Sequence, residues 1–297
     1  EFANRCAGIS FDHDWTNVLA AHEEIFLDRP KEKTVRVLQI GADRSKIGIL
    51  HKSSAAYERQ KAYARGFGNL DVVAFSRATD AVHPIDDGEL HIHPTNSPSR
   101  FLYVLNALAI AKKLQKPAVI SAQDPFETGL TAWLISRRLR IPLHIQVHTD
   151  FLSPAYRGLS FGNLIRASIA PFILRRATRI RVVSEKIKKG IESTCRVKVP
   201  VTVLPIYVDL QRFQDAKASE ALVQKYKDFG KRLLVVSRLE PEKNVALSIR
   251  VLARLPKDAC LIIAGSGSEK DFLVSLAKNL KVDERVFFED PEDVAPF

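Results

Sequence analysis

The sequence predicts an α/β fold made of two parallel-sheet units that follow each other along the chain. From residue 34 onwards, short runs of apolar and β-branched residues alternate with longer stretches of helical periodicity. The short runs are apolar on both faces, which is typical of parallel strands joined by crossover helices. The alternation changes its register near Pro205 and then begins again, so we expect two consecutive units.

The first unit, assigned to residues 34–207, is the longer of the two. Its strand candidates are Val35–Ile40, Asp71–Phe75, Leu90–His93, Ala118–Ser121, Leu143–Val147 and Ile180–Val183. Its helical stretches are Ser53–Arg65, Arg100–Leu114, Thr128–Leu139 and Asn163–Arg176. We expect these segments to form one sheet of parallel strands with helices packed against it.

The second unit, assigned to residues 208–297, has fewer strands. Its expected segments are a polar helix at Ala216–Lys227, strands at Arg232–Val236, Cys260–Ala264 and Val286–Phe288, and helices at Asn244–Leu255 and Glu269–Leu280. A doubly wound half-sheet normally has about five or six strands. We therefore expect two Rossmann-like domains that face each other, the second of them incomplete.

The composition fits a globular protein and excludes several classes. Lys and Arg number 45 against 34 Asp and Glu, which gives a net charge of +11 over 297 residues. No apolar run approaches the roughly 18 residues of a membrane-spanning helix, and nothing at the start resembles a signal peptide. The cysteines Cys6, Cys195 and Cys260 are too sparse for a disulfide framework, so we expect a reducing, cytoplasmic compartment. Because Met is absent, we expect a chain that was processed, trimmed or taken from a longer one.

The segment SRLEPEKN, Ser237–Asn244, carries the most specific chemical signal. It lies between the end of an expected strand and the start of a helix, where open α/β sheets bind ligands. Free N–H groups and the helix dipole favour an anion there, and Arg238 and Lys243 add two cations. A planar guanidinium and a mobile ammonium together suit a diphosphate. The alternative is a solvated loop in which these charges pair with Glu240 and Glu242.

This segment, together with LIIAGSGSEKDFL at Leu261–Leu273, resembles the donor-binding domain of retaining GT-B glycosyltransferases, specifically glycosyltransferase family 4. Members of that family use nucleotide-diphosphate sugars as donors. The resemblance implies that Arg238 and Lys243 hold the donor diphosphate and act in catalysis. It also implies that the backbone comes close to the donor at Gly265 and Gly267. The family's paired donor-site glutamates would follow residue 297, so no residue is assigned to them.

The first unit resembles the acceptor domain of the same family. QDPFETGL at Gln123–Leu130 and QVHTDF at Gln146–Phe151 are similar to segments that face the cleft between the domains. The resemblance implies that His148 is an active-site residue near the transferred sugar, whereas a lone histidine is otherwise more often structural. The candidate acceptor and cleft residues are Gly48, Gln123, Asp124 and Asp150. The chain departs from the family at Gly41–Leu50, which lacks a glycine pair, and at Ile206, where Asn-Gly usually begins.

The resemblance implies a metal-independent enzyme that transfers a sugar from a nucleotide-diphosphate sugar to an acceptor hydroxyl with retention of configuration. No cofactor is expected, because Arg238, Lys243 and the helix dipole would stabilise the charge on the departing diphosphate. The expected acceptor is a saccharide or a lipid-linked molecule. No nucleic-acid partner is expected, because no aromatic residues are interleaved with the basic ones. Two alternatives stay open: a sugar-nucleotide epimerase of the same fold, and a non-catalytic basic protein that binds membranes or polyanions.

Basic residues gather near an apolar helical stretch in the first unit. The two basic clusters are Arg137, Arg138 and Arg140, and then Arg175, Arg176, Arg179, Arg181, Lys186, Lys188 and Lys189. The apolar stretch Leu159–Leu174 precedes the second cluster, and this combination is typical of a helix that lies on an anionic membrane surface. One interpretation is therefore a peripheral position on the inner face of the membrane. The other is an interior helix with a solvated basic end.

Residues 1–33 fit neither unit. Trp15–Phe26 has helical periodicity, with Asp14 as its N-cap. This region also resembles the closing helix that family members place after their second domain. We therefore expect either the tail of a preceding unit or a simple N-terminal helix that packs on the first unit. Asp12 and Asp14 imitate a metal-binding DxD, but helix capping is favoured, and no metal ligand is assigned.

Overall fold

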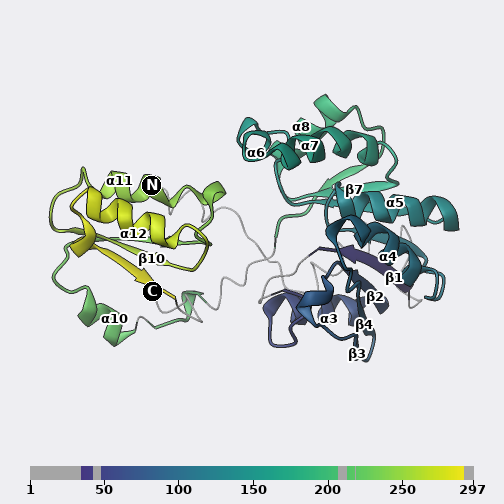
Figure 1. Cartoon of the computed structure of the whole chain (residues 1–297), viewed down its shortest axis with the longest axis horizontal. Helices are drawn as coiled ribbons and strands as arrows, with labels where there is room; N and C mark the ends of the chain where they lie inside the picture. The colour runs from purple at the N-terminus through teal and green to yellow at the C-terminus, as the bar shows by residue number, and fades with distance from the viewer. Residues whose placement is uncertain (1–34, 43–47, 207–212, 218, 291–297) are drawn as a thin grey trace. The chain divides into compact units, whose positions relative to one another are not determined.

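The computed structural model describes residues 35–42, 48–206, 213–217 and 219–290. The chain divides after Tyr207 into two compact units, each with its own sheet (Figure 1). The helix expected at Trp15–Phe26 and the motif at Asp12 and Asp14 lie outside the described residues.

The first unit is built on one sheet of eight strands in the order β3-β4-β2-β1-β5-β6-β7-β8. The strands are β1 (Val35–Gly41), β2 (Gly68–Ala74), β3 (Ile85–Asp87), β4 (Leu90–Pro94), β5 (Val119–Ala122), β6 (Leu143–Val147), β7 (Arg179–Val182) and β8 (Val201–Val203). Neighbouring strands pair in parallel except β3, which runs antiparallel to β4 at the edge. The expected parallel sheet is therefore confirmed.

Helices pack on both faces of this sheet. They are α3 (Ala55–Phe67), α4 (Tyr103–Ala111), α5 (Glu127–Leu139), α6 (Pro154–Gly158), α7 (Phe161–Leu174) and α8 (Glu185–Gly190), with 3-10 turns at Ala78–Asp80 and Arg100–Leu102 and a π-helical turn at Ile191–Cys195. Because successive strand residues point to opposite faces, Val72 packs against α3 while Val73 packs against α4 and its neighbours. Ser54 caps the start of α3, and Gly68 ends it in the left-handed conformation.

The chain changes direction across the sheet between β1 and β5. Strand β1 leads to β2 and β4 on one side, whereas β5 leads to β6, β7 and β8 on the other. Such a switch point leaves a crevice outside the carboxyl ends of the strands, which is where open α/β sheets bind ligands. The topology therefore marks one place in the first unit for a binding site.

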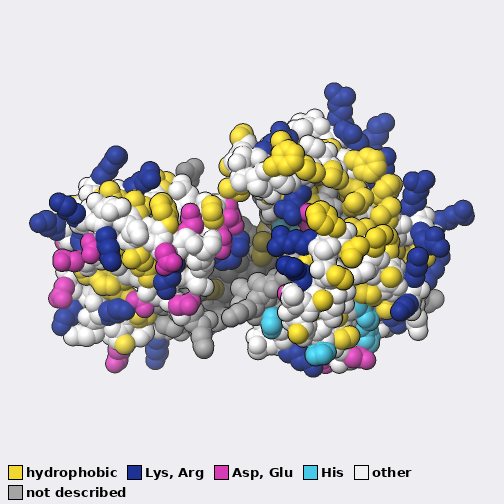
Figure 2. Space-filling view, in the orientation of Figure 1, with side chains coloured by type: hydrophobic (Ala, Val, Ile, Leu, Met, Phe, Trp, Pro, Cys, Tyr) yellow, Lys and Arg dark blue, Asp and Glu magenta, His cyan; other side chains and the backbone are white. Residues whose placement is uncertain are grey.

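Helix α7 has an unusual distribution of apolar side chains. Its buried residues are Ala167, Ala170, Ile173 and Leu174, so two of the four are small. The large apolar side chains that face outward are Phe161, Leu164, Ile165, Ile169 and Phe172, and Phe161 is 77% exposed. Figure 2 shows that apolar side chains cover a broad area of this unit. The interpretation of this stretch as an interior helix is therefore wrong, although no helix in the described part of the chain is long and apolar enough to cross a membrane.

The second unit contains a sheet of three parallel strands in the order β11-β10-β9. Its elements are α10 (Glu220–Lys225), β9 (Lys231–Val236), the 3-10 turn Pro241–Lys243, α11 (Val245–Leu252), β10 (Ala259–Ala264), α12 (Lys270–Asn279), the 3-10 turn Asp283–Arg285 and β11 (Val286–Glu289). Helices α11 and α12 share a core with Leu261 and Ile263 of β10. The other face of the sheet packs through Cys260 and Ile262 against Tyr226, which follows α10.

All the strands and helices expected from residue 35 onwards are present, with small shifts at their ends. The strands β3 and β8 and the helices α6 and α8 were not predicted. Each of these strands has three residues, which is too short for an alternating pattern to stand out. Each of these helices has at most six residues and shows no complete apolar stripe.

Candidate active site

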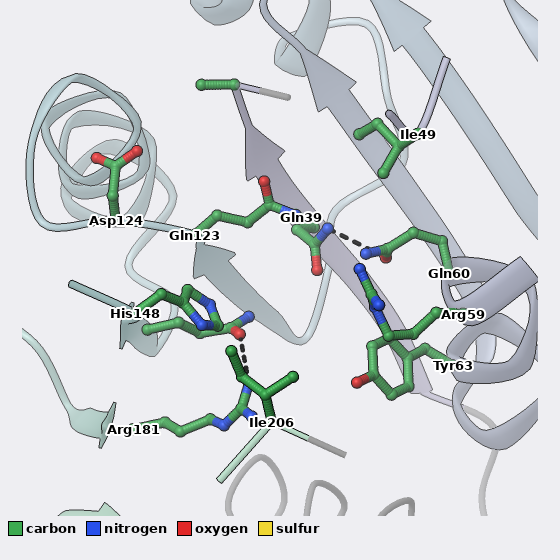
Figure 3. Close-up of a pocket in the computed structure, with 12 residues that line it drawn as sticks. Gln39, Ile49, Arg59, Gln60, Tyr63, Gln123, Asp124, His148, Arg181 and Ile206 are labelled. Carbon is green, nitrogen blue, oxygen red and sulfur yellow. Dashed lines mark hydrogen bonds between the residues drawn. The ribbon is translucent and has the colours of Figure 1, made fainter. Parts of the chain in front are cut away.

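A cavity of about 340 Å³ opens at the switch point of the first unit (Figure 3). It is lined by Gln39, Ala42, Ile49, Arg59, Gln60, Tyr63, Gln123, Asp124, Gln146, His148, Arg181 and Ile206. These residues come from the carboxyl halves of β1, β6 and β7, from the segments that follow β1, β5, β6 and β8, and from α3. Amide, guanidinium and imidazole groups dominate this lining, so the cavity suits a polar ligand.

The alternation of side chains along β5, β6 and β7 supplies one wall of the cavity. Each strand turns apolar residues toward the core formed by α4, α5 and α7, and turns polar residues toward the opposite face. The polar residues are linked in a chain: Gln146 Nε2 donates to Ser121 Oγ at 3.0 Å, and Arg181 Nη1 donates to Gln146 Oε1 at 2.9 Å. Ser121 Oγ also lies 3.1 Å from His144 Nδ1. This chain fixes the orientation of the Gln146 amide, with its oxygen toward the guanidinium.

Arg181 is a charged group inside the sheet, since only 5% of the residue is exposed. Nε and Nη2 donate to the carbonyl of Leu204 at 3.2 and 3.0 Å, and Nη2 also donates to the carbonyl of Pro205 at 3.3 Å. The side chain therefore ties β7 to the segment that follows β8. Grouping Arg181 with the basic surface clusters was wrong, because the period-two pattern of β7 directs it away from solvent.

His148 follows β6 directly and lines the cavity, as Figure 3 shows. Desolvation in the cavity, with repulsion from Arg181 and Arg59, lowers the pKa of His148 to about 4. The imidazole is therefore neutral at pH 7 and can donate or accept a hydrogen bond without carrying charge. Arg59, from the exposed side of α3, brings a second guanidinium to the cavity.

Asp124 and Gln123 follow β5 and lie on the same lining. Phe126 N donates to Asp124 Oδ1 at 2.7 Å, and desolvation nevertheless raises the pKa of this carboxyl to about 6. A side chain on Gly41 would lie 2.8 Å from Gln123 Oε1, and one on Gly129 would lie 2.8 Å from the carbonyl oxygen of Asp124. Both glycines therefore make room for the segment that carries the two candidate residues.

Two of the expected cleft residues lie outside this lining. Gly48 is buried, and its carbonyl accepts a hydrogen bond at 2.8 Å from the hydroxyl of Ser54, the N-cap of α3. The Asp150 carboxylate pairs with Lys186 at 2.9 Å. The structure thus brings His148, Gln123 and Asp124 together, whereas Gly48 and Asp150 have other contacts.

The candidate donor-binding cations lie at the carboxyl end of β9 in the second unit. Arg238 is exposed, and its Nη2 lies 2.9 Å from Glu242 Oε1. Lys243 ends the short 3-10 turn and is exposed, and it forms no ion pair with another described residue. The carboxylate of Glu240 accepts hydrogen bonds from the backbone N–H and the hydroxyl of Ser268. The loops after β9 and β10 are therefore joined beside the two cations.

Gly265 and Gly267 allow these two loops to touch. Gly265 has φ +145°, and a Cβ there would lie 2.1 Å from the carbonyl oxygen of Ser237. A Cβ on Gly267 would lie 2.4 Å from the carbonyl oxygen of Leu239. Backbone hydrogen bonds connect the same segments, including Leu239 N to the carbonyl of Ser266 at 2.9 Å. The glycines thus hold the loop that carries Arg238 against the end of β10.

Several cavity residues were not expected from the sequence. They are Gln39, Arg59, Gln60, Tyr63, Gln146 and Arg181. A usable signal was present for three of them, because Gln39, Gln146 and Arg181 interrupt apolar strand runs. A polar group inside a buried strand is costly unless it has a role. The residues on α3 carry no such signal, because polar residues are ordinary on an amphipathic helix.

Two family models match the chain, one in each unit. The model described as Glycosyltransferase Family 4 matches residues 61–212, and the model described as Glycosyl transferases group 1 matches residues 220–291. An alpha-monoglucosyldiacylglycerol synthase from Streptococcus pneumoniae is 28% identical over 203 residues, which are 64% of this chain and 46% of that protein. A second relative, from Campylobacter jejuni, is 41% identical over 80 residues, which are 27% of this chain and 20% of that protein. It is an N-acetylgalactosamine-N,N'-diacetylbacillosaminyl-diphospho-undecaprenol 4-alpha-N-acetylgalactosaminyltransferase. The chain thus spans less than half the length of either relative.

Solved structures with a similar fold include the HepE protein of Anabaena in complex with UDP and glucose. The likeness covers 88% of this chain and 71% of that one, with a TM-score of 0.63 and 16% identity. The likeness to the sucrose-phosphate synthase of Thermosynechococcus elongatus also covers 88% of this chain and 71% of that one, with a TM-score of 0.67 and 16% identity. These likenesses confirm the expected GT-B fold.

Proposed function

This chain belongs to Glycosyltransferase Family 4, whose model matches residues 61–212, and on that premise we propose that it transfers a sugar from a nucleotide-diphosphate sugar to an acceptor hydroxyl with retention of configuration. The donor would bind at the ends of β9 and β10 in the second unit. The acceptor would bind at the cavity of the first unit. The separate match of the second unit to a glycosyl transferase model supports this division of roles.

The observation that carries the proposal is the pair of cations that follows β9. The ion pair between Arg238 and Glu242 is exposed, and exposed ion pairs contribute only about 0.2–1 kcal/mol. A diphosphate that forms a bidentate contact with Arg238 can therefore displace Glu242 at a small cost in free energy. Lys243 is available beside it, since it forms no ion pair within the described chain. The weak ion pair between Arg238 and Glu242 is thus the one described contact of these two cations that a donor would have to replace.

The barrier to transfer lies in the departure of the diphosphate, on which negative charge builds. Arg238 and Lys243 would stabilise that charge in the transition state, which is the role of preorganised electrostatics in enzymes. This arrangement would need no metal ion or other cofactor. His148, neutral at pH 7 because its pKa is lowered to about 4, would hydrogen-bond the sugar rather than act as a cation.

Kinetics of three variants in the active protein test the proposal. Arg238→Ala and Lys243→Ala should each lower turnover by about 100-fold or more, the scale for the loss of one charge-stabilising group. Arg250→Ala removes a cation from the exposed side of α11 and should leave turnover unchanged. Unchanged turnover in both donor-site variants would refute the assignment. Loss of activity on addition of a chelator, restored by a divalent ion, would contradict the metal-independent mechanism.

An epimerase acting on a sugar nucleotide would use the same donor site but no acceptor. Incubation of the protein with the donor alone distinguishes the two, because an epimerase would convert it to an isomeric nucleotide sugar. A transferase should leave the donor unchanged apart from slow hydrolysis, since the acceptor hydroxyl is missing. Binding of polyanions without any binding of a nucleotide sugar would instead favour the non-catalytic alternative.

A lipid acceptor is supported by the outward face of α7. The pneumococcal relative is named for monoglucosyldiacylglycerol and the Campylobacter relative for a diphospho-undecaprenol compound. A groove of about 460 Å³ runs beside Ile165 and Ile169, between α7 and the start of α5. Arg175 and Arg176 are exposed at the end of α7, and such a combination of apolar area and cations binds anionic lipid surfaces. The protein would therefore work in the cytoplasm, at the inner face of the membrane.

Sedimentation with vesicles tests this membrane contact. The protein should sediment with vesicles that contain phosphatidylglycerol and not with pure phosphatidylcholine, and added salt should weaken the binding. Exchange of Phe161 and Leu164 for Ser should weaken it by about 100-fold or more, because each buried apolar side chain contributes about 1.5–3 kcal/mol. Phe272→Ser, on α12, is the matched control because Phe272 is also exposed. Equal binding by all variants would contradict this surface assignment.

A further inference from the structure

The guanidinium of Arg181 has no anionic partner among the described residues. Its hydrogen-bond acceptors are the carbonyls of Leu204 and Pro205 and the amide oxygen of Gln146, all of which are neutral. A guanidinium has five N–H donors, and these contacts leave one N–H of Nη1 without an acceptor in the described chain. A buried charge without a counter-charge is costly, so such a group normally has a partner.

A second cation makes the charge imbalance larger. Arg59 faces the same cavity from α3 and forms no ion pair with another described residue. Desolvation lowers the pKa of the Arg181 guanidinium, and repulsion from Arg59 lowers it further. Two guanidinium groups that converge on one cavity are costly in the empty protein and favourable around a bound anion.

Asp124 does not neutralise these cations, although it lines the same cavity. A carboxylate paired with a guanidinium has a lowered pKa. The pKa of Asp124 is instead raised, to about 6, because desolvation outweighs its hydrogen bonds to Phe126 and Thr128. Arg166 is the one described cation that lowers it. Asp124 is mostly ionised at pH 7, but it forms no ion pair with Arg59 or Arg181, so neither guanidinium has a bound counter-charge among the described residues of the lining.

We infer that this cavity binds a phosphate group carried by the acceptor, held between Arg181 and Arg59. The inference rests on the proposed function, because it assigns the substrate class of the acceptor side. A guanidinium binds two phosphate oxygens at once, and two cations match the charge of about −1.5 to −2 on a phosphate monoester at pH 7. The remaining oxygen atoms would accept hydrogen bonds from neutral donors of the lining.

The neutral donors come from the two sides of the cavity. Gln39 Nε2 donates to Gln60 Oε1 at 3.1 Å, and both amides line the cavity. Tyr63 and His148 also line it, and both are uncharged at pH 7: the pKa of the Tyr63 phenol is raised by desolvation, and that of His148 is lowered. Neutral donors add specificity for phosphate oxygens without adding further repulsion between cations (Figure 3).

Titration of the whole chain with phosphate, followed by NMR, tests the inference. Inorganic phosphate and glycerol 3-phosphate are the probes, and glycerol is the neutral control. Saturable binding should shift the His148 ring signals, because His148 lies on the lining. Glycerol should leave them in place. Diethyl phosphate, a monoanionic diester, is compared with glycerol 3-phosphate. Tighter binding of the diester would indicate a lipid headgroup of the diester type, and weaker binding would indicate a phosphate monoester.

Substitutions then locate the anion. Arg59→Gln should weaken phosphate binding by about 10-fold, the scale for the loss of one charged hydrogen-bonding group. Arg65→Gln lies on the exposed side of the same helix, outside the lining, and should leave the affinity unchanged. Arg181→Lys keeps the charge but cannot bind two phosphate oxygens in bidentate fashion, so it should weaken phosphate binding. The circular dichroism spectrum of this variant shows whether the fold is kept. Because Arg59 is exposed, Arg59→Gln remains informative even if Arg181→Lys does not fold.

The outcomes separate this inference from the proposed function. Absence of a phosphate-dependent shift of His148, or an affinity that Arg59→Gln leaves unchanged, would overturn the inference. The same shift in Arg238→Ala would support it, because phosphate bound at the donor site is then excluded as its cause. A protein that binds phosphate at His148 but no nucleotide sugar would keep the inference of an anion site and refute the transferase.

Discussion

The two candidate binding regions of this protein differ because only the first holds a buried cation among its described residues. In the second unit, Arg238 and Lys243 are exposed, and the ion pair of Arg238 with Glu242 is weak. In the first unit, Arg181 is 5% exposed and bonded to neutral acceptors. An exposed cation can exchange one anion for another at little cost, whereas a buried one is fixed before the ligand arrives.

This difference suggests different demands on the two ligands. A nucleotide sugar brings a diphosphate, which flexible surface cations can grip and release in each cycle. An acceptor must be positioned so that one hydroxyl meets the donor, which requires groups that do not move. The hydrogen bonds of Arg181 to Leu204 and Gln146 provide such rigidity. Four experiments test this contrast.

The largest expected effect is on the loops of the second unit. Gly265→Ala places a Cβ 2.1 Å from the carbonyl oxygen of Ser237 at φ +145°, so both the steric contact and the backbone angle are unfavourable. We expect a loss of more than about 3 kcal/mol in the free energy of unfolding, measured by urea denaturation. Gly230→Ala is the control, because a Cβ there meets only the movable Asp258 carboxylate, at 3.1 Å. Equal losses in the two variants would show that the loops are not held by this contact.

The next effect concerns the buried charge in the first unit. The pKa of Asp124 is about 6 in the folded protein against 3.8 for the ordinary carboxyl, so the folded state binds more protons between these pH values. Stability therefore falls as pH rises through this window. Asp124→Asn should remove this penalty and stabilise the protein at pH 7 by up to about 3 kcal/mol, with no gain below about pH 4.

Urea denaturation across this pH range measures the effect. The control is Asp150→Asn, whose carboxylate forms a surface pair with Lys186. Its removal should change stability by less than about 1 kcal/mol. A pH-independent difference between wild type and Asp124→Asn would contradict a raised pKa at this carboxyl.

A smaller effect is expected on the titration of His148. Its ring should titrate near pH 4, because desolvation and the two arginines disfavour the charged form. Arg59→Gln removes one repelling cation, so the pKa of His148 should rise toward the value of about 6.5 of a free histidine. NMR titration of the ring carbons measures both values, with Arg65→Gln as the control. A wild-type value near 6.5 would remove the electrostatic basis for a neutral His148.

The smallest effect should come from releasing Arg238. Glu242→Gln removes the exposed ion pair, which competes with the donor diphosphate for the guanidinium. Nucleotide binding, measured by calorimetry, should become about 2-fold tighter, which corresponds to a pair worth about 0.3–0.5 kcal/mol. Glu284→Gln, in the 3-10 turn before β11, removes an exposed acidic residue at the amino end of the sheet and should have no effect. Weaker binding in Glu242→Gln would mean that this carboxylate orients Arg238 for the donor.

The fold could be predicted well where each strand carries its own signal. The run Leu143–Val147 was expected as a strand and is found with the same ends, because apolar residues alternate along it and it is bounded by a proline and a polar segment. The stretch Asn163–Arg176 was correctly expected as a helix. Which side of that helix faces the core could not be predicted, because apolar residues occur on both sides.

The first cavity was only partly predictable for a related reason. His148 and Asp124 were expected because their segments resemble a known family, and they do lie on one lining. Arg181 was placed on a basic surface because neighbouring residues in the sequence are cationic, although strand alternation buries it. Arg59 could not be found at all, since a helix surface normally carries such residues.

The order of the longer strands and helices, the GT-B resemblance and the segment Ser237–Asn244 could be predicted from the sequence alone, because hydrophobic periodicity and a contiguous motif are local properties. That Arg59 and Arg181 share one cavity with His148 became evident from the folded chain. Those three residues come from α3, β7 and the end of β6, which only the strand order of the sheet brings together. The balance of charge in a cavity depends on such distant groups, and no window of sequence contains it.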